Sequence, residues 1–129
     1  MDRYLVILLG GAAGALSRYL AASAIMNRFG GRFPLGTFLI NVTGCFAIGA
    51  IMTLLSARSN LHPNWRLLIV VGFLGGYTTF SSFAFETFMA EREGMHWIGF
   101  LNAAGSVVAG YLAVWLGTLL AATVLKQNS

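Results

Sequence analysis

The 129-residue chain has very few charged side chains for its length. Only 9% of its residues are Asp, Glu, Lys or Arg, and 57% are hydrophobic. A soluble domain carries about 25% charged residues, which it needs to keep its surface in water. So few charges cannot solvate the surface of a small globule. The composition therefore predicts a protein whose main solvent is lipid.

Cysteine and histidine are also scarce, and their scarcity excludes several kinds of site. The single cysteine, Cys45, lies in an apolar run, so we expect no intramolecular disulfide and no cysteine-type zinc site. His62 and His96 lie in separate polar stretches without metal-binding spacing. There is no nucleophile–base pair or phosphate-binding loop, so we expect no enzyme. The net charge is +4, but the basic residues do not cluster, which argues against nucleic-acid binding.

Four apolar segments are long enough to cross a bilayer, whose core of about 30 Å needs about 20 helical residues. They are Tyr4–Met26, Leu35–Leu55, Leu67–Met89 and Trp97–Leu125. The first continues to Arg18 without a clear cleavage site, so we interpret it as a retained helix rather than a signal peptide. We expect residues 1–129 to form one all-α, multi-pass domain in a bacterial inner or plasma membrane.

Small residues recur at helical spacing in the first and third segments. Gly10 and Gly14 are four residues apart, and so are Gly72 and Gly76. Such ridges let helix backbones approach closely in lipid, where small residues mark helix contacts. The pattern predicts tight helix packing and gives no information about transport.

The third segment contains a stretch that is a poor helix former at mid-membrane. It reads Gly75-Gly76-Tyr77-Thr78-Thr79-Phe80-Ser81-Ser82-Phe83. We expect the third helix to be broken here. Irregular backbone at that depth persists only inside protein, or beside water or an ion. The freed carbonyls are hard oxygen ligands that suit sodium, although a kink without an ion explains the same composition.

Polar side chains inside the second and fourth segments need partners or water. Thr37, Asn41 and Cys45 follow one another at four-residue spacing on one helix face, and so do Asn102 and Ser106. Each set predicts either a helix–helix hydrogen bond or donors that line a hydrated path. The sequence leaves both interpretations open.

In the third segment, Phe80, Phe83 and Glu86 recur every three residues and are expected on one face. The edges of aromatic rings are electropositive and can line a path for a small anion, although most phenylalanines simply pack. Glu86 is the one acid within a span and Arg18 the one base. A pairing between them cannot be derived from the sequence.

Three motifs, in order along the chain, resemble those of the Fluc (CrcB) family of fluoride channels. Gly75–Phe83 resembles that family's GGxTTFSTF signature, and Pro34–Asn41 its PxGTLxxN motif. Gly11–Tyr19 is similar to its glycine-rich first motif, which ends in Arg and an aromatic residue. The resemblance implies passive export of fluoride by an antiparallel, dual-topology homodimer with a sodium ion at its centre.

The resemblance also implies roles for individual residues. The implied fluoride path comprises Asn41, Phe80, Phe83, Thr37, Thr79, Ser81, Ser106, Glu86 and Asn102. Gly75 and Thr78 are implied to bind sodium through main-chain carbonyls, and Arg18 to be structural. The chain departs from the family pattern at three positions: Ser82 replaces a usual Thr, Asn102 stands where some members have Tyr, and Gly110 where some have a second serine.

The alternative function to a channel is proton-coupled drug export. Small dual-topology proton-coupled multidrug exporters also have four short helices, and Glu86 would be the acid that exchanges protons. Those exporters place the acid in the first helix, where this chain has Arg18. Conduction needs sites that are weak enough to release the ion, and the near absence of Lys and Arg within the spans favours a channel.

Overall fold

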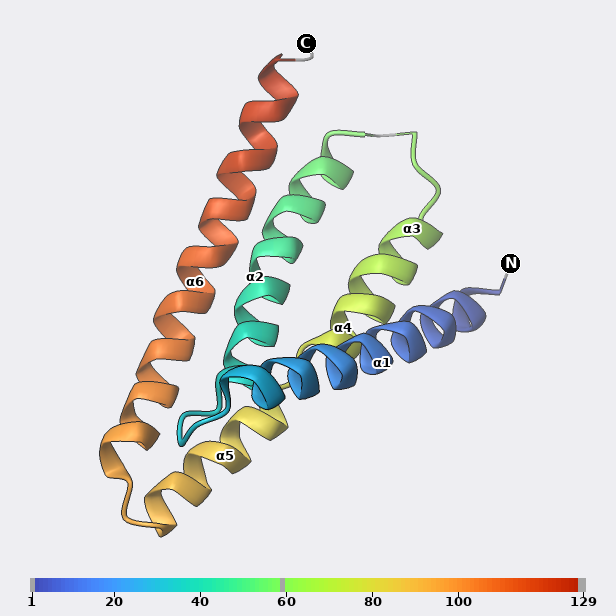
Figure 1. The fold of residues 1–129 in the computed structure, drawn as a ribbon. Coiled ribbons are helices and arrows are strands. Elements are labelled where there is room, and N and C mark those ends of the chain that lie inside the picture. Colours follow the sequence, from blue (N-terminus) through green and yellow to red (C-terminus); the bar gives the residue numbers. More distant parts are fainter. Residues whose placement is uncertain (1, 59, 128–129) are drawn as a thin grey trace.

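The chain folds into four long helical spans that are joined by short connections (Figure 1). This computed structural model describes residues 2–58 and 60–127. The spans are α1 (Arg3–Phe29), α2 (Leu35–Ser56), a segmented third span from Asn64 to Arg92, and α6 (His96–Gln127). The segments of the third span are α3 (Asn64–Arg66), η1 (Leu67–Leu74), α4 (Gly75–Tyr77) and α5 (Phe80–Arg92).

These helices confirm the four apolar segments expected from the sequence, with ends that differ by three residues or fewer. Within the described residues, four helical spans are long and apolar enough to cross a membrane, and no strand occurs. In Figure 1, α2 and α6 lie side by side and run in the same direction, whereas α1 crosses the third span obliquely.

Local side-chain chemistry explains where several of the helices begin and end. Asp2 caps α1, because its Oδ1 accepts the Tyr4 N–H at 3.2 Å. Thr79 caps α5 in the same way, and its Oγ1 accepts the Ser82 N–H at 3.3 Å. The turn between α5 and α6 contains Gly94 at φ 74°, a left-handed conformation that glycine adopts without strain.

The contact between α1 and the third span is made by glycines, as their spacing predicts. Gly10 and Gly14 of α1 lie directly against the main chain of Gly72 and Phe73. A Cβ at Gly14 would fall on the carbonyl oxygen of Phe73, so the backbones meet without intervening side chains. α2 and α6 meet in a similar way, since a Cβ at Gly117 would fall on the carbonyl of Phe46.

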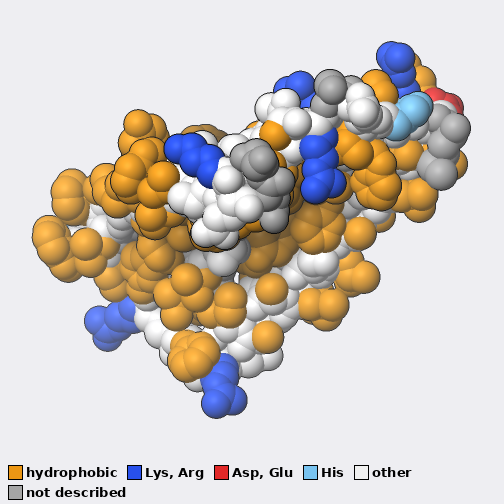
Figure 2. All heavy atoms as spheres, turned by 90° about the horizontal axis from the view of Figure 1, so that it is seen from above, with side chains coloured by type: hydrophobic (Ala, Val, Ile, Leu, Met, Phe, Trp, Pro, Cys, Tyr) orange, Lys and Arg blue, Asp and Glu red, His pale blue; other side chains and the backbone are white. Residues whose placement is uncertain are grey.

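The outer surface of the bundle is mostly apolar, as a lipid-facing surface should be (Figure 2). Large hydrophobic side chains are exposed along every span, for example Leu8 at 68% and Val107 at 67%. Tyr4, Trp65 and Trp97 lie exposed at span ends, where interfacial aromatics belong. The arrangement fits a multi-pass membrane protein.

Candidate functional site: an uncharged pocket beside the interrupted third span

Helical geometry stops for two residues in the middle of the third span. α4 ends at Tyr77 and α5 begins at Phe80. Between them, Thr78 (φ −82°, ψ 159°) and Thr79 (φ −152°, ψ 115°) are extended. The interruption follows an eight-residue π-helix, η1, a geometry that often accompanies functional sites. Main-chain groups at this depth must find partners within the protein.

Asn41 of α2 supplies partners for both main-chain groups of Thr79. Its Oδ1 accepts the Thr79 N–H at 2.8 Å, and its Nδ2 donates to the Thr79 carbonyl at 2.9 Å. In a continuous helix the Thr79 N–H would donate to the carbonyl of Gly75, four residues earlier. The Asn41 amide therefore takes the place of a helical hydrogen bond at the interruption. An amide carries two N–H donors, so the second Nδ2–H stays available to a ligand.

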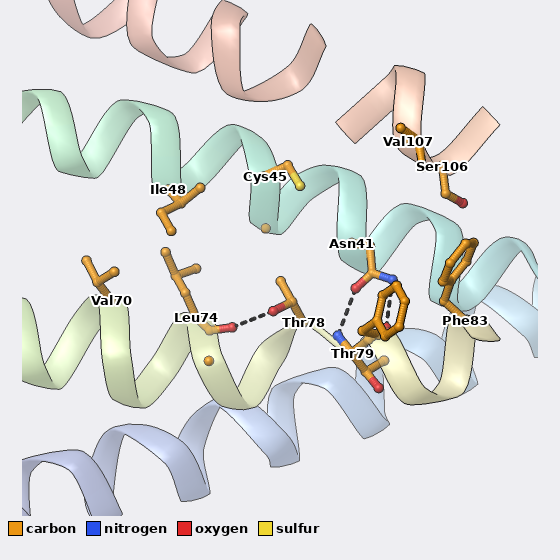
Figure 3. A pocket seen from close by; sticks show the side chains of 13 residues that line it. Asn41, Cys45, Ile48, Val70, Leu74, Thr78, Thr79, Phe83, Ser106 and Val107 are labelled. Carbon is orange, nitrogen blue, oxygen red and sulfur yellow. Dashed lines mark hydrogen bonds between the residues drawn. The ribbon is translucent and has the colours of Figure 1, made fainter. Parts of the chain in front are cut away.

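A pocket of about 380 Å³ lies between α2, the interruption and α6 (Figure 3). It brings together seven of the residues that the resemblance implied for the fluoride path or the sodium site: Asn41, Gly75, Thr78, Thr79, Phe80, Phe83 and Ser106. The other lining residues are small or apolar, and none is Asp, Glu, Lys, Arg or His. The rings of Phe80 and Phe83 lie with centroids 5.5 Å apart and planes inclined by 49°. The pocket thus combines neutral donors with aromatic rings and contains no charge.

The Ser106 hydroxyl in this pocket belongs to a short hydrogen-bonded chain. Ser106 Oγ donates to Asn102 Oδ1 at 3.3 Å, and Asn102 Nδ2 donates to Thr87 Oγ1 at 2.9 Å. Asn102 is only 1% exposed and does not line the pocket. It connects α6 to α5 and holds the hydroxyl of Ser106. Thr87 was not predicted from the sequence, because nothing in its spacing relates it to Asn102.

Glu86 and Thr37 lie in a different place from the phenylalanines. Thr37 Oγ1 donates to Glu86 Oε1 at 2.7 Å, whereas Glu86 Oε2 is buried without a hydrogen-bond partner in the described residues. Both residues line a wider hollow of about 810 Å³, which also includes Arg32 of the first connection. Two steps of three residues rotate a side chain by about 120° around an α-helix, so Glu86 has turned away from the face of Phe80.

A smaller cavity of about 270 Å³ lies between the pocket and this hollow. Thr79 lines both the small cavity and the pocket, and Thr37 lines both the small cavity and the hollow. Arg18 also lines it, and its Nη1 donates to the Thr78 carbonyl at 3.2 Å. In the described part of the chain Arg18 forms no ion pair with Glu86.

Ser81, like Asn102, is a predicted path residue that lines none of these three cavities. Its side chain is exposed, and its Oγ lies 3.4 Å from Thr79 Oγ1. The apolar lining residues Ile48, Val70 and Leu74 were not singled out from the sequence. Aliphatic residues in a membrane span carry no signal that separates a pocket wall from a lipid contact.

Comparison with known proteins now supports the resemblance of the motifs. Residues 5–118 match the family model described as "CrcB-like protein, Camphor Resistance (CrcB)". A protein of Solibacter usitatus named "Fluoride-specific ion channel FluC" is 62% identical over 119 residues, which cover 92% of this chain and 98% of that protein. A protein of the same name from Acidobacterium capsulatum is 52% identical over 115 residues, or 89% and 92% of the two chains. The chain belongs to the CrcB family.

Proposed function

We propose that this protein is a fluoride-selective channel that lets cytoplasmic fluoride leave the cell passively. The observation that carries the proposal is the uncharged pocket in which the Asn41 amide, the Ser106 hydroxyl and the rings of Phe80 and Phe83 meet. Relatives that match nearly the whole chain bear the name of a fluoride-specific channel.

The donors in the pocket suit an ion that loses water slowly. Fluoride is small and tightly hydrated, so a pore must return hydrogen bonds as water leaves. The second N–H of Asn41 does this as a neutral donor, and the Ser106 hydroxyl does so when its O–H turns from Asn102 Oδ1 to the ion. Aromatic ring edges add weak positive potential between the donors. Sites of this kind hold the ion long enough to admit it and release it again, as conduction requires.

Arg18, the one base that lies far from the end of a span, is kept out of the pocket. Arg18 donates to the Thr78 carbonyl and does not line the pocket. A guanidinium that faced the ion directly would bind it strongly and slow its release. Through its hydrogen bond to the Thr78 carbonyl, Arg18 stabilises the irregular main chain. This is the structural role that we assign to it.

The pocket needs a second copy of the chain to become a pore. Phe80 is 79% exposed and Val107 67%, so one protomer leaves the pocket open on the outer side of the bundle. Lipid cannot hydrogen-bond the amide and hydroxyls there. We propose that an antiparallel partner covers this face in a bacterial inner or plasma membrane. Each protomer would then contribute to two equivalent pores.

The flux measurement that tests this function follows directly from the uncharged pocket. Purified protein in liposomes loaded with potassium fluoride should release fluoride when a potassium ionophore is added, because uncoupled anion flow builds up a voltage that the ionophore relieves. A fluoride electrode follows the release. Liposomes loaded with potassium chloride should release little. Fluoride release that needs proton exchange and ignores the ionophore would contradict a channel.

The exporter alternative receives no support from the site. Its essential acid, Glu86, is hydrogen-bonded to Thr37 and lies outside the pocket. The relatives that match most of the chain are named as fluoride channels. A family of ion channels is not a class of enzyme, so we propose no catalytic step.

We further propose that sodium binds at the dimer centre as a structural ion. The Gly75 carbonyl loses its helical donor because the Thr79 N–H is directed to Asn41. The Thr78 carbonyl accepts one hydrogen bond from Arg18 and has a second lone pair. Gly75 is exposed, and both residues line the pocket that a partner copy would cover. Hard carbonyl oxygens are suitable ligands for sodium, and no anionic side chain is required.

Gly75→Ala tests this site without disturbing the protomer. The nearest atom to a Cβ at Gly75 is the Val70 carbonyl oxygen at 3.9 Å, an ordinary contact. We therefore expect a folded protein whose fluoride flux falls by about tenfold or more, because the methyl group obstructs the shared centre. Flux in liposomes with and without sodium gives the readout.

Gly76→Ala provides the contrast, because its Cβ would lie 2.5 Å from the Gly11 carbonyl and should impair folding itself. Normal flux and normal sodium dependence in Gly75→Ala would contradict a carbonyl site at that residue.

A further inference from the structure

We propose that the connection between α2 and α3 holds the phosphate of an anionic phospholipid. A pocket of about 210 Å³ lies at this end of the bundle. Its polar side chains are Arg58, His62, Trp65 and Arg66, together with Ser56. Figure 2 looks onto this end of the molecule, where Lys and Arg side chains stand out among hydrophobic ones. The proposal requires only that the chain spans a membrane, and it is independent of which ion is conducted.

The side chains of the pocket offer hydrogen-bond donors and almost no acceptors. Arg58 and Arg66 carry guanidinium groups, which only donate, and the Trp65 indole N–H only donates. His62 Nδ1 accepts the Asn64 N–H at 3.2 Å, which leaves the proton of the neutral ring on Nε2, a further donor. No Asp or Glu lines the pocket. Among the described residues neither guanidinium forms an ion pair. This set of groups fits a phosphate oxygen and repels a cation.

The remaining lining identifies the source of the phosphate as a lipid. Met52, Leu55 and Leu61 form the apolar side of the same pocket. Met52 and Leu55 belong to the last turns of α2, a span that faces lipid, and Leu61 and Trp65 are 37% and 50% exposed. A soluble phosphate would gain nothing from these side chains, whereas an acyl chain can continue from them into the bilayer. Basic pockets beside membrane helices typically bind anionic headgroups in this way.

A net negative lipid fits better than a zwitterionic one. Phosphatidylcholine and phosphatidylethanolamine carry a cation next to the phosphate, and that cation needs an acceptor or an acid. The lining provides two arginines and no acid. Phosphatidylglycerol has no such cation, so both arginines can attract its negatively charged phosphate. A basic residue near an anionic membrane surface contributes a factor of about five in binding, so two contribute about 25-fold.

Trp65 is a built-in reporter for the experiment. The chain has three tryptophans, and Trp97→Phe together with Trp115→Phe leaves Trp65 as the only indole. The variant with Trp65 alone is reconstituted in vesicles of phosphatidylglycerol and phosphatidylcholine. In one series part of the phosphatidylglycerol is brominated, and in the other part of the phosphatidylcholine is brominated. Quenching of Trp65 gives the relative association constant of the two lipids. We expect phosphatidylglycerol to be preferred by about 25-fold, and Arg58→Gln with Arg66→Gln to reduce the preference to about one.

Arg28→Gln with Arg92→Gln is the matched control, because it removes the same charge from the last turns of α1 and α5, at the other end of the bundle. It should keep the full preference. Helical circular dichroism and a single size-exclusion peak show that each variant is folded. A preference that survives Arg58→Gln with Arg66→Gln would overturn the proposal. So would a preference that millimolar inorganic phosphate abolishes, because that result identifies a soluble-anion site.

Discussion

Asn41→Asp should lower fluoride flux by about 100-fold in the liposome assay. The change removes both N–H donors of the amide and places a negative charge at the pocket, where the conducted ion is itself an anion. A lost hydrogen bond to a charged partner costs about 1.5–3 kcal/mol, which corresponds to a factor of about 10 to 100. Repulsion between carboxylate and fluoride adds to that loss.

The same substitution also disturbs the interruption of the third span. The Asp carboxylate would present an oxygen to the Thr79 carbonyl at the position where Nδ2 donates at 2.9 Å. Reduced flux in Asn41→Asp could therefore reflect either a lost pore donor or a distorted backbone. Phe83→Ile separates the two causes, because the Phe83 ring lines the pocket and no hydrogen bond to the interruption depends on it. We expect its flux to fall by about tenfold or more, since aliphatic edges lack the ring's positive potential.

Phe100→Ile is the control for loss of an aromatic ring. Phe100 lies on α6, is 57% exposed and does not line the pocket. Its variant should conduct at the wild-type rate. Near wild-type flux in both Asn41→Asp and Phe83→Ile would remove the pore assignment altogether.

The spans were predictable because their signal is long and independent of packing. About 20 apolar residues in a row mark a membrane helix wherever its neighbours lie. The interruption near Thr78 was also signalled locally, by two glycines followed by residues with poor helix propensity. These features depend on residues that are close together in the chain. Their positions could therefore be derived without knowing how the helices are arranged.

The partners of the polar side chains could not be predicted in the same way. Asn41 and Thr79 are 38 residues apart, and two hydrogen bonds join them. Helical spacing places Asn41 on a face of α2, but the depth and rotation of α2 against α5 decide what it meets. The sequence therefore left open whether Asn41 joins helices or faces a pore. In the structure one amide bonds to Thr79 and also lines the pocket, so the two alternatives do not exclude each other.

The three-residue spacing predicted that Glu86 shares a face with Phe80 and Phe83, and helix geometry explains why it does not. A three-residue repeat follows one face of an α-helix only over a short distance, because each step falls about 60° short of a full turn. Phe80 and Phe83 still share a pocket, and Glu86, one step further, lines the hollow with Thr37. Thr79 of the pocket and Thr37 of the hollow both line the small cavity between these two sites. This connection depends on three spans at once, and no single segment reveals it.

A version of the protein locked in one membrane orientation should be inactive alone and active when its opposite is co-expressed. With four spans, the N-terminus, the α2–α3 connection and the C-terminus lie on one side of the membrane. That side carries Arg3, Arg58, Arg66 and Lys126, and the other carries Arg28, Arg32 and Arg92. The orientation of a membrane protein follows the difference in Lys and Arg between its two sides, and here four such residues face three, which is almost no difference. The chain should therefore insert both ways up in similar amounts.

Two opposite copies can pair about an axis in the membrane plane, so that each surface meets its own equivalent. The exposed face with Gly75 and Phe80 would then be covered at the same depth in both copies. Two lysines added at the C-terminus should fix one orientation, and two added to the α5–α6 turn the other. We expect each locked version alone to give fluoride flux at the background of empty liposomes, and co-expression to restore it. A lysine pair split evenly between the two sides keeps the bias unchanged and should leave flux normal. Full flux from either locked version alone would rule out the antiparallel dimer.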